Sequence, residues 1–149
     1  MGKEYLSDRY MENPISEKWF ISGNTASHKN GYKITNRRLV KGQRSKDCFD
    51  LYVPQMWAIK IKFRNAIREE KPIYLHVKFY RKSKHAFDYI NACQTLQDCM
   101  VLAGLIKDDN ADELMPIFEP YVYSPDKAGV EIWIEYKKCA EDETSAHTH

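Results

Sequence analysis

The sequence lacks the features of several large classes of protein. It has no run of about eighteen apolar residues, so no segment matches a membrane-spanning helix. Its opening segment, MGKEYLSDRY, has no apolar centre of the kind that a signal peptide contains. Motifs of serine hydrolases, zinc proteases and the common nucleotide-binding folds are also missing. We therefore expect a soluble, cytoplasmic protein with no membrane partner.

Cysteine is scarce and shows no metal-binding spacing. The four cysteines form no Cys-x-x-Cys pair and are scattered among apolar neighbours. This pattern favours buried, reduced thiols over disulfides or zinc ligands. The residues concerned are Cys48, Cys93, Cys99 and Cys139.

Acidic residues are absent from residues 18–46, and the charge of the whole chain is strongly segregated. Residues 1–87 contain 19 Lys and Arg against 8 Asp and Glu, whereas residues 88–149 contain 4 against 13. A basic surface suits a polyanion, and a separate acidic cluster suits divalent cations. In the alternative interpretation, the two halves interleave in the folded chain and the split is incidental.

Length and hydrophobicity predict a single domain. With 149 residues and 43% hydrophobic side chains, the chain can bury one core. We place the domain at residues 18–138, between loosely held terminal segments at 1–17 and 139–149. The expected fold class is α/β (α+β), a small mixed sheet with helices packed on it.

The elements of this domain are predicted from apolar spacing and turn residues. Pro54 is placed in the first turn of its helix, and Gly104 after the last turn of the second. Asp88 or Asn91 is expected to cap that second helix. In chain order the elements are a strand at 18–24, a basic loop with a hairpin at 32–40, a helix at 54–70, a strand at 72–80, a helix at 88–103, and strands at 117–123 and 129–138, the last two joined as a hairpin.

Particular side chains in these elements carry further expectations. His76 is expected to be structural. The three tryptophans, Trp19, Trp57 and Trp133, are expected to anchor the core. Two tyrosines flanked by basic residues are favoured for contact with nucleic acid, namely Tyr32 and Tyr80.

Five acids near the second helix form a candidate metal site. Hydrolysis of a phosphodiester with Mg²⁺ requires two or more carboxylates that converge on the ion. An acidic loop after a helix is also commonly just solvated, or caps the next element. The pool consists of Asp88, Asp108, Asp109, Asp112 and Glu113.

Two stretches together resemble the RusA-like family of Holliday junction resolvases. The first is ISGNTASHKNGYKI, which is similar to that family's N-terminal strand and following loop. The second is DYINACQTLQDCMVLAGLIKDD, which matches the family's pattern of an aspartate, an Asn three residues later, an internal Asp, a Gly and a paired Asp, without a gap. The resemblance extends from about residue 18 to residue 136.

This resemblance implies a homodimeric endonuclease that cuts four-way DNA junctions symmetrically in recombination and repair, and is often encoded on prophages. It implies Mg²⁺, with Mn²⁺ as a substitute, as cofactor. By its motif, Asp88, Asp109 and Asn91 are catalytic, Asp88, Asp108 and Asp109 bind the metal, and Asp98 is structural. DNA phosphates are expected to bind to the basic segments, at Lys29, Asn30, Lys33, Arg37, Arg38, Lys41, Arg81, Lys82 and Lys84.

The sequence departs from the family at two positions. Ile90 occupies the place of a second aspartate, and Gln94 that of a lysine. A site with one carboxylate fewer binds Mg²⁺ more weakly, unless Asp112, Glu113 or Asn91 compensates. The alternative function is therefore a catalytically impaired relative that binds junctions without cutting. A third interpretation is a domain with no role in nucleic-acid binding.

Chain geometry constrains how Asp88 and Asp109 meet. A straight helix over residues 88–103 is roughly 22 Å long at 1.5 Å per residue. Residues 104–109 return at most about 18 Å when fully extended. We therefore predict that dimerisation shapes the site, with Asp109 approaching Asp88 of the partner subunit unless the return is nearly direct.

Overall fold

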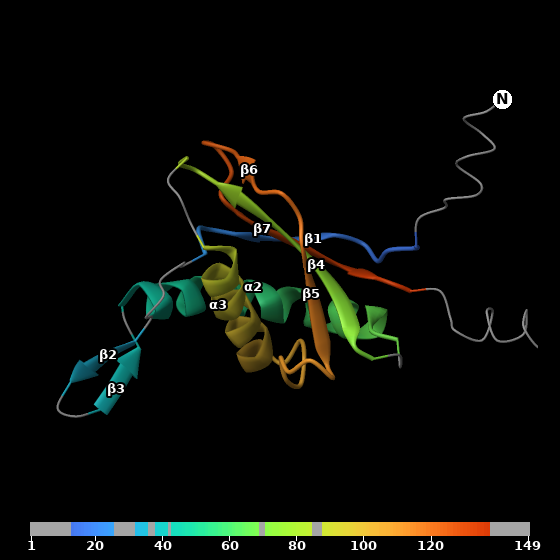
Figure 1. Cartoon of the computed structure of the whole chain (residues 1–149), viewed down its shortest axis with the longest axis horizontal. Coiled ribbons are helices and arrows are strands. Elements are labelled where there is room, and N and C mark those ends of the chain that lie inside the picture. Colours follow the sequence, from blue (N-terminus) through green and yellow to red (C-terminus); the bar gives the residue numbers. More distant parts are fainter. Residues whose placement is uncertain are drawn as a thin grey trace, which may run out of the picture.

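The computed structural model describes residues 13–25, 32–35, 38–41, 43–68, 71–84 and 88–137, with only the backbone given for residues 32–45. Its main element is a five-stranded mixed sheet (Figure 1). The order is β1 (Trp19–Ser22), β7 (Gly129–Glu135), β4 (Ile73–Arg81) and β5 (Leu114–Phe118), with β6 (Val122–Tyr123) also paired to β4. β7 is antiparallel to both neighbours, whereas β5 and β6 are parallel to β4. The expected α+β fold class is confirmed.

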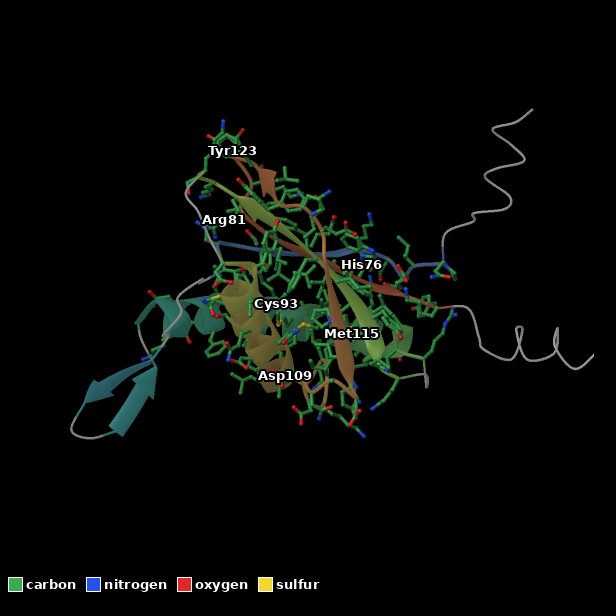
Figure 2. All side chains as sticks on the ribbon, in the orientation of Figure 1. His76, Arg81, Cys93, Asp109, Met115 and Tyr123 are labelled. Carbon is green, nitrogen blue, oxygen red and sulfur yellow. The ribbon has the colours of Figure 1, made fainter. Side chains whose placement is uncertain are left out.

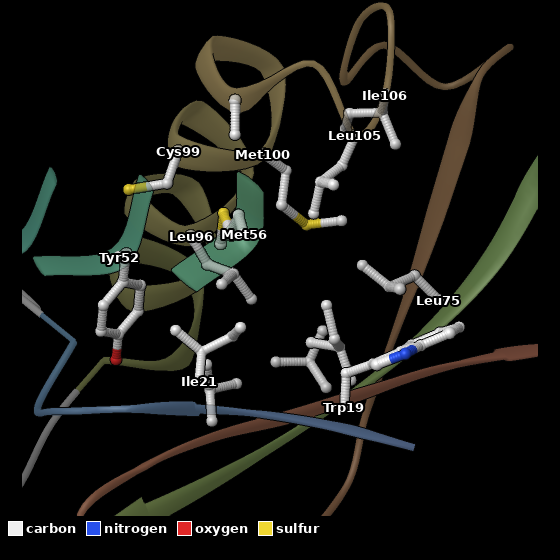
Figure 3. Close-up of a cluster of buried hydrophobic side chains, with 14 of the residues drawn as sticks. Trp19, Ile21, Tyr52, Met56, Leu75, Leu96, Cys99, Met100, Leu105 and Ile106 are labelled. Atoms are coloured by element: carbon white, nitrogen blue, oxygen red, sulfur yellow. The ribbon is translucent and has the colours of Figure 1, made fainter. Parts of the chain in front are cut away.

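Two helices pack against each other and cover one face of this sheet. They are α2 (Gln43–Ala66) and α3 (Tyr89–Ala103). Residues of β4 alternate between buried and half-buried, so every second side chain faces the helices. Figure 3 shows the resulting core, where Leu96 and Met56 of the helices meet Ile21 and Leu75 of the sheet.

The helix predicted at 54–70 begins earlier, so Pro54 lies inside α2 and not in its first turn. Burial continues N-terminally of the proline at Cys48, Tyr52 and Val53, which extends the apolar stripe by two turns. Pro54 itself is exposed, where its missing N–H and its ring are tolerated more easily than in the core. Packing of the stripe therefore overrides the local preference of proline.

The strand predicted at 117–123 is divided into β5 and β6, with Pro120 in the interruption. Both pieces pair along the same edge of β4, one after the other. β6 also makes no hairpin with β7, which pairs with the opposite edge of β4. Proline has no N–H for a strand ladder, which explains the break.

The two halves of the sequence interleave in the sheet. β7 from the acidic half lies between β1 and β4 from the basic half. Residues N-terminal of Lys18 also join it: the amide of Tyr136 donates to the carbonyl of Pro14, and Ile15 forms a bridge with Glu135. Residues 14 and 15 thus satisfy backbone groups beside the end of β7.

The remaining predictions concern the basic hairpin, the tryptophans, the cysteines and membrane-spanning helices. The hairpin in the basic segment forms as β2 (Tyr32–Thr35) and β3 (Arg38–Lys41). Trp19 belongs to the core as predicted, whereas Trp133 is buried outside the core cluster, against His76. Trp57 is 59% exposed and is not a core anchor. Cys48, Cys93 and Cys99 are buried thiols outside any disulfide, while Cys139 lies outside the described residues. Within the described part of the chain, no helix is long and apolar enough to cross a membrane.

Candidate functional site

Asp88 is the N-cap of α3. One carboxylate oxygen accepts from the backbone amide of Ile90 at 2.9 Å and from that of Asn91 at 3.3 Å. The other accepts from the Asn91 side-chain amide at 3.2 Å. The three contacts fix the carboxylate at the positive end of the helix dipole, where negative charge is stabilised. Asp88 and Asn91 therefore form one hydrogen-bonded pair, called the Asp88 pair below.

No carboxylate supplements this pair from the neighbouring positions of α3. Ile90 is 70% exposed, so an apolar side chain points into solvent beside Asp88. Gln94, one turn further on, is also exposed. Asp98, expected to be structural, is half-buried in the third turn. The helix is held at this end by Tyr89, whose hydroxyl accepts from the amide of Tyr121 at 2.5 Å.

The second group of acids builds a turn between α3 and β5. The Asp108 carboxylate accepts from the amide of Asp109 at 2.7 Å and from the side chain of Asn110 at 3.1 Å. These hydrogen bonds, the first of them foremost, hold the pKa of Asp108 below its ordinary value. The Asn110 side chain in turn accepts from the amides of Asp112 and Glu113. We call Asp108 and Asp109 the acidic turn.

Asp109 lies beside the C-terminal part of α3, at the opposite end from the Asp88 pair (Figure 2). Its charge nevertheless reaches Cys93, on the buried side of the helix. Burial foremost, and then Asp109, raise the pKa of that thiol to about 12. The acidic turn therefore lies close enough to α3 for the charge of Asp109 to act on a thiol of that helix.

The donor chemistry of these residues suits Mg²⁺, which prefers carboxylate and amide oxygens. However, the residues described for a single chain include no group of three or more His, Cys, Asp or Glu side chains placed to hold a metal ion. Glu113, suggested as a compensating ligand, forms an ion pair with Lys71 instead. The Asp88 pair and the acidic turn therefore do not make a complete metal site within one chain.

The predicted phosphate-binding residues are partly described. Arg81 ends β4 half-buried, and Lys82 and Lys84 follow it in exposed positions. The Lys84 ammonium lies 4.9 Å from the centre of the Tyr123 ring. Only the backbone is given for three others, which lie on the β2–β3 hairpin: Lys33, Arg38 and Lys41. Lys29, Asn30 and Arg37 lie outside the described residues.

Half-buried His76 occupies the sheet face that the helices leave uncovered. Its two ring nitrogens lie 2.7 Å from a Glu119 carboxylate oxygen and 2.9 Å from one of Glu135. The imidazole stacks on Trp133 with ring centres 5.1 Å apart. These contacts support the structural role expected for His76. Tyr80, on the same face, donates to Glu131 at 3.3 Å.

Sequence reasoning missed a basic hollow between the C-terminal end of α2 and the loop after α3. Its cations come from three separate segments of the chain, so no local motif indicates them. The one available signal was the pair Arg64 and Arg68, both exposed, the first in the last turn of α2 and the second two residues after its end. The hollow is lined by Arg64, Ile67, Arg68, Lys71, Ile73, Leu105, Ile106, Lys107 and Glu113.

Comparisons with known proteins leave the family of this chain open. No protein-family model matches the chain, and no curated protein matches its sequence. The likeness to RusA-like resolvases therefore rests on the two stretches quoted above.

Proposed function

We propose that this protein is a Mg²⁺-dependent endodeoxyribonuclease that acts on branched DNA and resolves four-way junctions by paired nicks. The observation that carries the proposal is the position of the Asp88 pair. A carboxylate fixed by three hydrogen bonds begins α3, shortly after the exposed Lys82 and Lys84. Lysines there can hold phosphates on either side of the bond that is cut.

The proposed active unit is a homodimer in which the Asp88 pair of one chain meets the acidic turn of its partner. Each chain would supply half of a metal site, which accounts for the incomplete set of ligands within one chain. Mg²⁺ bound there would activate water and neutralise charge on the phosphate. Asn91 orients Asp88, while Asp109, with help from Asp108, completes the carboxylate set.

Exposed apolar side chains on α2 and α3 support self-association. Trp57 is 59% exposed and Leu102 is 65% exposed, and both line a hollow of about 400 Å³. Large apolar patches on a protein surface commonly mark contacts with other proteins. We call the surface around Trp57 and Leu102 the helix face, which also carries exposed Leu51, Ile61 and Val101.

A cutting assay tests the enzyme. The wild-type protein, incubated with a synthetic four-way junction and Mg²⁺ or Mn²⁺, should release symmetric nicks. Asp88→Asn should bind the junction and leave it intact, because the amide keeps the cap but not the charge. Lys62→Glu, an exposed change elsewhere on α2, serves as a control that still cuts. Wild-type protein that binds the junction but never nicks it would contradict the proposal.

Mixing two inactive variants tests whether the site is shared. Neither Asp88→Asn nor Asp109→Asn should cut alone. If the ligands come from two chains, each mixed dimer holds one intact site and one site that lacks both carboxylates. Mixing should then restore nicking of single strands. Complete inactivity of the mixture, with exchange of subunits verified, would show that each site belongs to one chain.

The second candidate is a relative that binds junctions without cutting them. The observation that favours it is the exposed isoleucine beside Asp88, where the resemblance implies a carboxylate. If Ile90→Asp converts a binding protein into a nuclease, the missing carboxylate is the cause of inactivity. Ile90→Asn, which adds polarity without charge, is the matched control and should remain inactive.

A further inference from the structure

The basic hollow lies where the end of α2, the loop after α3, the start of β4 and the residue before β5 meet. Its volume is about 290 Å³. Four apolar side chains line it together with four cations and one carboxylate. The apolar set is Ile67, Ile73, Leu105 and Ile106, the cations are Arg64, Arg68, Lys71 and Lys107, and the carboxylate is Glu113.

Contacts with the protein orient the cations around this hollow. A terminal nitrogen of Arg64 donates to the carbonyl of Gly104 at 3.0 Å. The Arg68 guanidinium lies 3.6 Å from the centre of the Tyr136 ring. A guanidinium has five N–H donors in a rigid fork, so one hydrogen bond or one stacking contact leaves donors for a ligand.

The charge of the hollow selects the class of ligand. Glu113 neutralises Lys71 through their ion pair, and three further cations then remain without a carboxylate among the lining residues. A metal cation is therefore disfavoured, whereas arginine forks match the geometry of phosphate oxygens. Ile67 is the half-buried apolar side chain of the lining, whereas Ile73, Leu105 and Ile106 are buried beneath the surface. An apolar wall beside the cations suits a sugar ring to which a phosphate is attached. The combination is that of a nucleotide.

We propose that the basic hollow binds one nucleotide of a DNA strand, with its phosphate between Arg68 and Lys107. Lys107 directly precedes the acidic turn, so a strand held there runs past Asp108 and Asp109. The identity of the ligand as DNA rests on the proposed function. The anion site itself rests on the hollow and its charges.

The test uses full-length Asp88→Asn protein, which leaves the junction uncut, and fluorescence anisotropy with a labelled junction. Adding Lys107→Glu should weaken binding at least tenfold. It should also lower the slope of log affinity against log salt by about one, because one phosphate contact is lost. The matched control is Lys62→Glu, an exposed lysine reversed outside the hollow, which should weaken binding less than threefold. Equal losses in the two variants would overturn the proposal.

Arg68→Lys gives a second measurement that preserves charge. The lysine lacks the planar fork, so junction affinity should still fall severalfold while thermal unfolding stays close to that of the parent. If affinity is unchanged in Arg68→Lys and also in Arg68→Ala, the arginine does not contact the strand and the proposal fails.

A third experiment distinguishes a DNA strand from a free nucleotide as the ligand of the hollow. Inorganic phosphate and a deoxynucleoside monophosphate are titrated while the amide signals of Ile106 and Lys107 are followed by NMR. Weak binding of both, together with loss of junction affinity in Lys107→Glu, supports the proposal. Tight binding of the monophosphate alone, with junction affinity equal in Lys107→Glu and its control, assigns the hollow to a free nucleotide and overturns it.

These outcomes are independent of catalysis. If the wild-type protein binds junctions without cutting and Lys107→Glu selectively weakens that binding, the nuclease function fails and the nucleotide site stands. If the wild-type protein cuts and Lys107→Glu binds as its control does, the nuclease function stands and the nucleotide site fails.

Discussion

At the scale of single residues, Asp88 carries two roles that substitution can separate. Its carboxylate caps α3, and it is also the proposed metal ligand. Asparagine caps helices about as well as aspartate, whereas alanine costs about 1 kcal/mol of stability. We therefore expect Asp88→Ala to lower the free energy of unfolding by about that amount and Asp88→Asn to change it little. Urea denaturation measures the difference.

Both substitutions should abolish cutting, since neither side chain carries the charge. A stable Asp88→Ala protein would show that the Asn91 and backbone contacts do not contribute to folding. Full cutting by Asp88→Asn would remove Asp88 from the metal site.

The lowered pKa of Glu135 predicts that the free energy of unfolding depends on pH. Hydrogen bonds from Lys137 foremost, and also from His76 and Asn13, lower its pKa from 4.5 to about 2. The folded protein thus binds the proton less readily than the unfolded chain. The resulting stability is present above about pH 4.5 and is lost as the pH falls towards 2.

In Glu135→Gln this part of the pH dependence should disappear. Urea midpoints of the variant and the wild type should differ at pH 7 and approach each other near pH 2.5. Glu131→Gln, on the same strand but outside the His76 contacts, is the control. A wild-type advantage that persists undiminished at pH 2.5 would contradict the assignment.

At the scale of elements, the sequence was most informative where local signals and packing agree. In α3 the cap at Asp88, the buried stripe and Gly104 all indicate the same helix, and its bounds were predicted closely. At Pro54 the local signal and the packing of the stripe conflict, and packing prevails. The pairing of β6 with β4 joins segments far apart in the chain, and turn residues do not encode such a contact.

The candidate site was also only partly predictable from the sequence. The spacing from Asp88 to Asp109 could be read directly, as could the cap. The basic hollow could not be predicted from the sequence, because Lys71 and Lys107 come together only when β4 and the loop after α3 meet. A motif search detects neighbours in sequence, and this group consists of neighbours in space.

The proline inside α2 gives a prediction about that helix. A proline within a helix removes one hydrogen bond and typically costs about 3 kcal/mol relative to alanine. Since Pro54 is exposed, Pro54→Ala should raise the free energy of unfolding, by about 1 kcal/mol or more. Thermal unfolding followed by circular dichroism measures this. A loss of stability would mean that the proline ring contributes more by packing than the missing hydrogen bond costs.

At the scale of the whole molecule, the helix face predicts the state of association. Trp57→Lys together with Leu102→Lys replaces two exposed apolar side chains by charge. We expect the variant to fold but to elute as a monomer in light-scattering chromatography, and to lose junction cutting. Leu51→Lys at the margin of the face is a milder control. A wild-type protein that is already monomeric at cutting concentrations would refute the shared site.

The order of the sheet has a consequence for how the chain acquires its structure. β7 joins β1 to β4, yet among the described strands it comes last in the sequence. During synthesis, β1 has no partner in this sheet until residues 129–135 have left the ribosome, more than a hundred residues after it. Such long-range pairing makes folding slow and leaves strand edges open to wrong partners. The nascent chain thus exposes an edge of β1 that the folded sheet covers with β7.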